Sequence, residues 1–194
     1  MGWPALPIYT MRVSADSLVE RLARLPSLIT AVETIAFAHD HARSMSRVVV
    51  GSFGDTLVIA WSPTSDRSRE LAAYVSPEEA HGDPVDERSD VYTLGAFLYR
   101  VLVGAAPYRG VSAHQVLKQV KHGAPAAIES LAPRAPRELV RIAHVAMARG
   151  PAWRYPSARE LAYELEQFQM RRKPLPHRRL AWSRARDHEG HRES

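Results

Sequence analysis

The stretch that most constrains the fold is residues 89–104, SDVYTLGAFLYRVLVG. Its apolar residues recur at spacings of three and four, which predicts an α-helix. The apolar stripe comprises Val91, Leu94, Phe97, Leu98, Val101 and Leu102. Further apolar side chains lie off that stripe, so the helix is expected to be buried within a larger core. We expect Ser89 or Asp90 to cap its first turn. Gly104 is expected to end the helix, and Pro107 prevents it from resuming.

Two motifs flank this helix. The first runs from Ser76-Pro77-Glu78 through Asp90 to the turn at 107–110, PYRG, and the second is GPAWRYPSA at 150–158. Together they resemble bacterial Ser/Thr protein kinases. The first is similar to the family's A/S-P-E motif and to the long central helix of its large C-terminal lobe. The second is similar to the family's D-P-x-x-R-Y-P-S-A. The resemblance covers about residues 8–170.

The resemblance implies roles for several residues. In that family the arginine of the second motif pairs with the glutamate of A/S-P-E, which implies an ion pair between Glu78 and Arg154. The family's aspartate at the start of the central helix receives backbone N–H groups of the catalytic loop, which implies that Asp90 serves the fold. We therefore expect Glu78, Asp90 and Arg154 to be structural residues. His39, at the end of an earlier helix, is also expected to be structural rather than a ligand or base.

The rest of the chain predicts further helices and one β-hairpin. An extended piece at 8–13 precedes a short helix that Ser14 or Asp16 introduces. The hairpin pairs residues 48–50 with residues 57–59 across a glycine-bearing turn. The other expected elements are helices at 27–39, 113–121, 137–149 and 158–169, the last capped by Ser157 with Glu160, and a loop at 123–136.

The expected fold class is therefore mainly α, a protein-kinase-like C-terminal lobe with a small β-hairpin and with the N-terminal lobe absent. The expected domains are a hinge-like lead at 1–13, the kinase-like lobe at 14–170 and a basic disordered tail at 171–194. That tail holds eight Lys/Arg against three Asp/Glu, a surplus of five that equals the net charge of +5. The high isoelectric point is therefore a property of the tail.

The resemblance also locates the positions where the family keeps its catalytic groups. With the hairpin as anchor, the catalytic aspartate position is Ala42, the asparagine position is Arg47 and the metal aspartate position is Ala60. The family uses those groups to orient the hydroxyl and hold magnesium. Alanine does neither, and an arginine repels a cation. We therefore expect no catalytic, cofactor-binding or metal residue, and no use of the family's ATP and magnesium. An alternative register makes Asp40 the base and puts Met45 at the asparagine position.

Composition sets further limits. The chain has no cysteine, which excludes disulfides and thiolate metal sites. It has no apolar run of about 18 residues, the length that a membrane span needs. Its N-terminus lacks the pattern of a secretory signal, so a cytoplasmic protein is expected. Residues 1–170 balance in charge and give no electrostatic reason to bind nucleic acid.

These observations favour a truncated, catalytically inactive kinase-like domain that acts as a binding or scaffold module. Its partner would be a protein, such as a kinase N-lobe or another kinase. An alternative is one half of a split Ser/Thr protein kinase whose N-lobe is on another chain. A third hypothesis is nucleic-acid or membrane-surface binding through the basic tail, for which affinity would fall with added salt.

Overall fold

The computed structural model describes residues 9–12, 17–41, 47–53, 56–62 and 69–172. Most of this described part is helical, as the sequence predicted. The elements in chain order are β1 (Tyr9–Arg12), α1 (Leu18–Leu22), α2 (Leu25–His41), β2 (Arg47–Phe53), β3 (Thr56–Ser62), α3 (Arg69–Ala72), α4 (Pro77–His81), α5 (Glu87–Val103), α6 (Ala113–His122), α7 (Ile128–Leu131), α8 (Arg137–Ala146), the 3-10 helix η1 (Pro151–Trp153) and α9 (Ala158–Arg172). Ala42 and the predicted tail from residue 173 onward lie outside the described residues.

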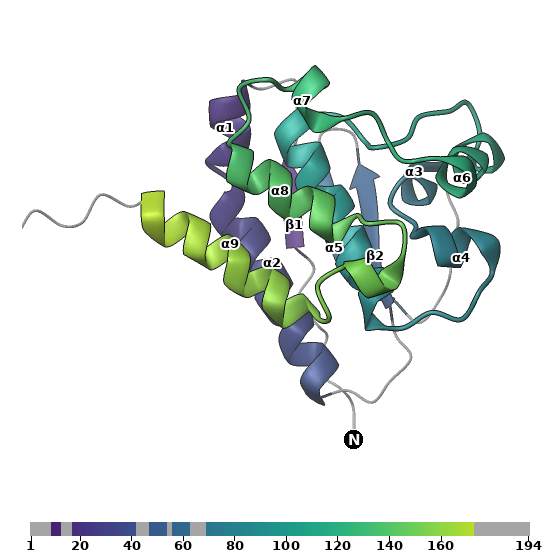
Figure 1. The fold of residues 1–194 in the computed structure, drawn as a ribbon, viewed down its shortest axis with the longest axis horizontal. Helices are drawn as coiled ribbons and strands as arrows, with labels where there is room; N and C mark the ends of the chain where they lie inside the picture. The colour runs from purple at the N-terminus through teal and green to yellow at the C-terminus, as the bar shows by residue number, and fades with distance from the viewer. Residues whose placement is uncertain (1–8, 13–16, 42–46, 54–55, 63–68, 173–194) are drawn as a thin grey trace, which may run out of the picture.

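The helix α5 is the centre of the fold (Figure 1), with α8 and α9 crossing on one side of it and α2 alongside α9. Residues 89–99 are buried without interruption. This burial agrees with the apolar residues on nearly every side of the helix. The helix ends as predicted at Gly104, whose φ of 83° lies in the left-handed region that favours glycine.

The start of α5 differs from the prediction. The N-cap is Asp86, whose carboxylate accepts from the amide of Arg88 at 2.8 Å. Ser89 and Asp90, which were expected to cap, lie inside the first turns with buried side chains. All three residues are of the types that cap helices, so local sequence does not choose between them. Tertiary partners engage Ser89 and Asp90, and Asp86 is left at the boundary.

The C-terminal end of α5 is capped by a side chain from α1. The Arg21 side chain donates from Nε to the carbonyl of Val101 at 2.9 Å and from Nη2 to that of Leu102 at 3.0 Å. These are among the last carbonyls of the helix, which have no partner within it. A cation at this end also interacts favourably with the helix dipole. Arg21 therefore fixes α1 against the end of the central helix.

The predicted β-hairpin is present, and a third strand joins it. The sheet order is β1-β3-β2, with both neighbouring pairs antiparallel. The register pairs Val49 with Ala60 and Arg47 with Ser62. The extended piece predicted at the N-terminus is β1, whose Tyr9 pairs with Ile59. The turn at 54–55 lies outside the described residues.

Several boundaries differ from the predictions. The short helix α1 is capped by Ser17, in a capping box with Glu20, and not by Ser14 or Asp16, which lie outside the described residues. The helix α2 begins two residues early because its first turn accepts Pro26, which needs no amide donor there. The predicted loop at 123–136 contains the short helix α7, which buries Ile128.

The two C-terminal helices also differ in length from the predictions. The helix α8 ends at Ala146, three residues early. The helix α9 continues to Arg172, past the predicted start of the tail at residue 171. Its last turn is held by an ion pair in which Arg171 donates to Glu138 of α8 at 2.6 Å. At its other end the Ser157 hydroxyl bonds the Glu160 carboxylate, the two residues predicted to cap it. Among the described helices, none has the length and apolar character needed to cross a bilayer.

Gly95 of α5 packs tightly against α8. A methyl group added at this glycine would lie 2.6 Å from the Cβ of Ala146 and 3.2 Å from its carbonyl carbon. Ala146 is itself fully buried, so it has little room to move. The absence of a side chain at Gly95 is therefore what lets the two helices pack at this distance.

We predict that Gly95→Ala destabilises the protein. Overpacking a core costs about 1–3 kcal/mol, whereas replacing a helical glycine gains about 0.5–1 kcal/mol. Because the added methyl group would approach Ala146 so closely, the cost should lie in the upper part of its range, and the net loss in the free energy of unfolding should reach about 1–2.5 kcal/mol by urea denaturation. The control is Gly123→Ala, because that glycine is extended and has open space around it. A Gly95→Ala variant more stable than the wild type would show that α8 can move away without cost.

Candidate functional site

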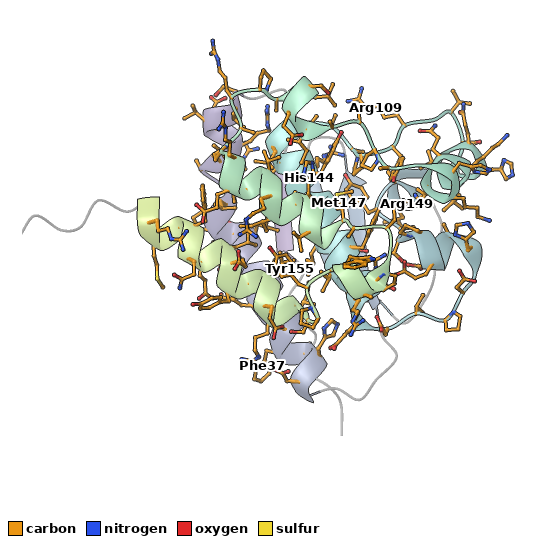
Figure 2. The ribbon with its side chains drawn as sticks, in the orientation of Figure 1. Phe37, Arg109, His144, Met147, Arg149 and Tyr155 are labelled. Atoms are coloured by element: carbon orange, nitrogen blue, oxygen red, sulfur yellow. The ribbon has the colours of Figure 1, made fainter. Side chains whose placement is uncertain are left out.

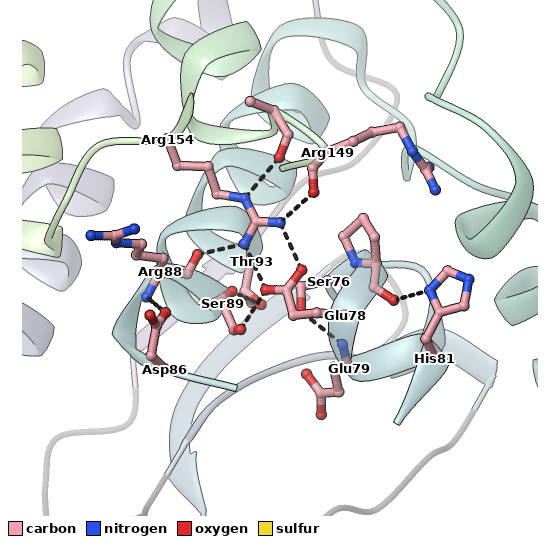
Figure 3. A network of polar contacts seen from close by, with 12 residues as sticks. Ser76, Glu78, Glu79, His81, Asp86, Arg88, Ser89, Thr93, Arg149 and Arg154 are labelled. Carbon is pink, nitrogen blue, oxygen red and sulfur yellow. Dashed lines mark hydrogen bonds and ion pairs between the residues drawn. The ribbon is translucent and has the colours of Figure 1, made fainter. Parts of the chain in front are cut away.

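Glu78 and Arg154 meet although they lie 76 positions apart in the sequence. Glu78 is in the first turn of α4, which Ser76 caps by accepting from the Glu79 amide. Pro77 occupies the first helical position, where its missing N–H is not needed. Arg154 follows η1 and has an extended backbone. These two local structures direct the carboxylate and the guanidinium toward each other (Figure 3).

The contact is the ion pair that the resemblance implied, and it is bidentate. Nη1 of Arg154 donates to Oε1 of Glu78 and Nη2 donates to Oε2, each at 2.7 Å. The Arg154 side chain is 0% exposed and the Glu78 side chain 10%. Two parallel N–H groups that match two carboxylate oxygens form one of the stronger polar contacts in proteins.

The remaining guanidinium hydrogens of Arg154 go to backbone carbonyls. Nε donates to Ala148 at 2.7 Å, Nη1 to Arg88 at 2.9 Å and Nη2 to Arg149 at 3.1 Å. With the two bonds to Glu78, all five donors of the guanidinium are used. The charge is therefore buried without an unpaired hydrogen. The site joins α4, the start of α5 and the segment after α8.

The electrostatics of Glu78 follow from this arrangement. Burial raises the pKa of its carboxyl, but hydrogen bonds from Arg154, from Ser89 and from its own backbone outweigh burial and lower the pKa to about 2. Ser89 donates its hydroxyl to Oε1, which explains why this serine is not the cap of α5. Glu78 is therefore ionised over the whole physiological range.

A buried aromatic pair lies against the ion pair. The Tyr92 ring is 5.0 Å from the central carbon of the Arg154 guanidinium, a cation–π arrangement. Tyr92 and Tyr108 join their hydroxyls at 3.2 Å, and Tyr108 donates onward to the carbonyl of Gly123 at 2.9 Å. Burial raises the pKa of Tyr92 well above its usual value, so its hydroxyl stays protonated. These contacts connect the ion pair to the segment that follows α6.

Asp90 makes a second buried contact between distant elements. Nε2 of His39 donates to Oδ2 of Asp90 at 2.9 Å, with side chains 11% and 8% exposed. The bond joins the end of α2 to the first turns of α5. The family role expected for Asp90, acceptance from the catalytic loop, concerns residues 42–46 and lies outside the described residues. Sequence reasoning treated His39 as structural but did not identify Asp90 as its partner.

Two of the three positions aligned with the family's catalytic groups lie in the sheet, and the third, Ala42, lies outside the described residues. Arg47 begins β2 and Ala60 lies within β3, where their backbones are fixed by the hairpin register. Asp40, the base of the alternative register, lies in the last turns of α2 and pairs with Arg159 of α9. In the described ranges no three His, Cys, Asp or Glu residues gather in a way that could hold a metal ion.

Sequence reasoning missed Arg149. Its guanidinium donates to the carbonyls of Val120 at 2.8 Å, Lys121 at 2.7 Å and Gly123 at 2.8 Å. These carbonyls belong to the end of α6 and the residue that follows it, where helical partners are lacking. Figure 2 places Arg149 on the side of the molecule that faces α6. An arginine that binds backbone carbonyls leaves no spacing pattern in the sequence, so no signal marked this residue.

Comparison with known proteins agrees with this geometry. The family model described as protein tyrosine and serine/threonine kinase matches residues 48–165. A probable serine/threonine-protein kinase of Corynebacterium efficiens is 40% identical over 99 residues, which cover 49% of this chain and 15% of that protein. The serine/threonine-protein kinase PknB of Mycobacterium tuberculosis is 39% identical over 94 residues, which cover 48% of this chain and 15% of PknB.

A solved structure supports the same fold. The PknI kinase domain of Mycobacterium tuberculosis aligns with a TM-score of 0.52 and 24% sequence identity. The alignment covers 79% of this chain and 57% of that kinase domain. This similarity concerns the fold. The similarity to the two curated relatives spans 15% of the length of each of them.

We predict strong coupling between Glu78 and Arg154 in a double-mutant cycle. Each single change to alanine leaves a buried charge without its partner and should cost about 3–5 kcal/mol. The double variant should lose less than the sum of the two, with a coupling energy of about 2–3 kcal/mol by urea denaturation. The matched control is the exposed pair of Glu138 and Arg171, whose coupling should stay below about 1 kcal/mol. Additive losses at Glu78 and Arg154 would contradict an energetic pairing.

We also predict that Glu78 contributes to acid unfolding. Its folded-state pKa of about 2 lies below the ordinary value of 4.5. Its stabilisation is therefore complete above about pH 4.5 and is lost as the pH falls toward about 2. Glu78→Gln should be less stable than the wild type at neutral pH, and its stability should fall less steeply through this window. Urea midpoints measured at a series of pH values test this, and parallel curves for the two proteins would exclude it.

Proposed function

Because this chain belongs to the protein tyrosine and serine/threonine kinase family, we propose that it is a noncatalytic member that acts by binding another protein. The proposal rests on the contrast between the structural contacts and the catalytic positions. The contacts that hold the lobe together, Glu78 with Arg154 above all, are complete. The positions aligned with the family's catalytic groups hold Ala42, Arg47 and Ala60.

The chemistry of these positions does not fit magnesium or phosphoryl transfer. Phosphoryl transfer depends on positioning and on stabilising developing negative charge, which the family does with metal ions. Magnesium prefers oxygen ligands, and neither Arg47 nor Ala60 has a side-chain oxygen. A guanidinium at the asparagine position would repel the metal. Asp40 does not restore the site, because the register that makes it the base puts Met45 at the asparagine position, and methionine has no oxygen ligand for magnesium.

A binding role is consistent with the contacts that hold the described lobe together. A protein that binds through a surface needs rigid elements to hold that surface. The ion pair fixes α4 and α5 to the segment after α8, the bond between His39 and Asp90 fixes α2, and Arg21 fixes α1. None of these contacts needs a nucleotide. The described lobe therefore has an internal framework that is independent of catalysis.

We predict that the chain shows no magnesium-dependent binding of ATP. A ligand present at a hundred times its Kd would stabilise the protein by about 2.7 kcal/mol, which a thermal-unfolding assay detects. With millimolar ATP and excess magnesium, the Tm should match that of the protein with magnesium alone. Arms with EDTA separate metal-dependent from metal-free binding, and a catalytically complete kinase of the family serves as positive control. Micromolar ATP affinity that requires magnesium would overturn the proposal.

A further inference from the structure

A groove lies on the lobe away from the aligned catalytic positions. It opens between the C-terminal end of α5, the turn at 105–109, the end of α6 and the segment at 123–126 that leads to α7. Its volume is about 740 Å³, within the range of about 300–1,000 Å³ that is common for binding pockets. None of the residues discussed above as catalytic positions lines it. The groove is thus a separate feature of this fold.

The floor of the groove is apolar and partly open to solvent. Val103, Ala105 and Ala106 line it and are only half-buried. Leu131 of α7 lines it as well and is 53% exposed. An exposed leucine within a concave surface gains more from a partner than one on a convex surface, because a ligand can cover it on several sides.

The rim of the groove carries a positive charge. Arg109 lines it together with the polar side chain of His122, and no Asp or Glu is among the described residues that line it. The adjacent helix α6, AHQVLKQVKH, contributes Lys118 and Lys121 and contains no acid. Burial raises the pKa of Tyr99 in the groove wall, and the positive charge of Arg109 partly counteracts that effect. Figure 2 shows Arg109 between the positions of α7 and α6.

The walls are held in place by hydrogen bonds. The Tyr99 hydroxyl donates to the carbonyl of Ala126 at 2.9 Å. Gly123 accepts at its carbonyl from Tyr108 at 2.9 Å and from Arg149 at 2.8 Å. On the opposite side, Gln119 donates to the carbonyl of Arg109 at 2.6 Å. The groove therefore exists before any ligand arrives, which lowers the entropic cost of binding.

We propose that this groove binds a short segment of a partner protein in which an apolar side chain is flanked by carboxylates. The apolar side chain would cover Leu131 and the floor, and the carboxylates would pair with Arg109 at the rim and be attracted to Lys118 and Lys121 of the adjacent helix α6. This inference rests on the proposed binding function and names its surface and partner class. A nucleic acid fits less well, because its phosphates would use the rim but leave the apolar floor uncovered.

The test uses fluorescence anisotropy with the full chain and three pools of labelled peptides. In the first pool a central leucine or phenylalanine is flanked by glutamates. The second pool replaces the central residue by serine, and the third replaces the glutamates by lysines. A labelled oligothymidine is the fourth probe. The first pool should bind at least about tenfold more tightly than each of the other probes, a difference of about 1.4 kcal/mol.

Four variants assign the binding to the groove. Arg109→Glu and Leu131→Ser should each weaken binding of the first pool about tenfold, as expected for residues central to an interface. Arg171→Glu is the matched charge reversal on α9, and Val111→Ser is the matched apolar change at an 87% exposed residue that does not line the groove. Both controls should bind like the wild type. Thermal unfolding of all four variants checks that each remains folded.

The outcomes separate this inference from the proposed function. Equal binding of the three pools, or full binding by folded Arg109→Glu, would overturn the groove assignment. Binding of oligothymidine that depends on Arg109, without preference for the first peptide pool, would assign the surface to nucleic acid and overturn it too. Magnesium-dependent ATP binding would instead overturn the noncatalytic proposal, and a positive peptide result would still hold for the groove.

Discussion

The structure depends on the complete pairing of one buried cation. The Arg154 guanidinium has five donors, and each of them has an acceptor in Glu78 or in a backbone carbonyl. Leaving even one buried donor unpaired costs about 1–3 kcal/mol. The acceptors come from α4, from the first turns of α5 and from the segment after α8. Those three segments can therefore take only relative positions that bring all the acceptors to the same guanidinium.

The ion pair and the central helix were predictable from sequence for different reasons. The helix α5 was predictable because its apolar residues recur at helical spacing on nearly every side, as burial within a core requires. The pairing of Glu78 with Arg154 was predictable only through the resemblance, because each residue lies in a recognisable motif. Nothing in the residues between them indicates that they meet. Long-range polar contacts are specified by the whole fold, and the local spacing of residues in the sequence does not predict them.

The remaining errors have the same physical origin. Asp86, Ser89 and Asp90 are equivalent as caps in isolation, and only Glu78 and His39, which come from other elements, decide between them. Arg21 caps the C-terminal end of α5 and Arg149 caps that of α6, although neither belongs to the helix that it caps. Capping rules applied to the sequence of α5 or α6 alone therefore do not identify them. The groove is likewise formed by segments from several elements, and its charge pattern becomes visible only when α6 and the turn at 105–109 are placed together.

The mutual dependence of Glu78 and Arg154 has a consequence for how such sequences change over generations. A substitution that removes either side chain leaves the other as an uncompensated buried charge. Loss of the pair by two successive substitutions therefore passes through a much less stable protein. Positions that served only chemistry carry no such penalty, and once catalysis is no longer required they are free to drift. A lineage that abandons phosphoryl transfer is thus expected to retain its internal salt bridge long after its metal ligands have gone. In a divergent sequence, such a pair therefore indicates the fold and is not by itself a sign of activity.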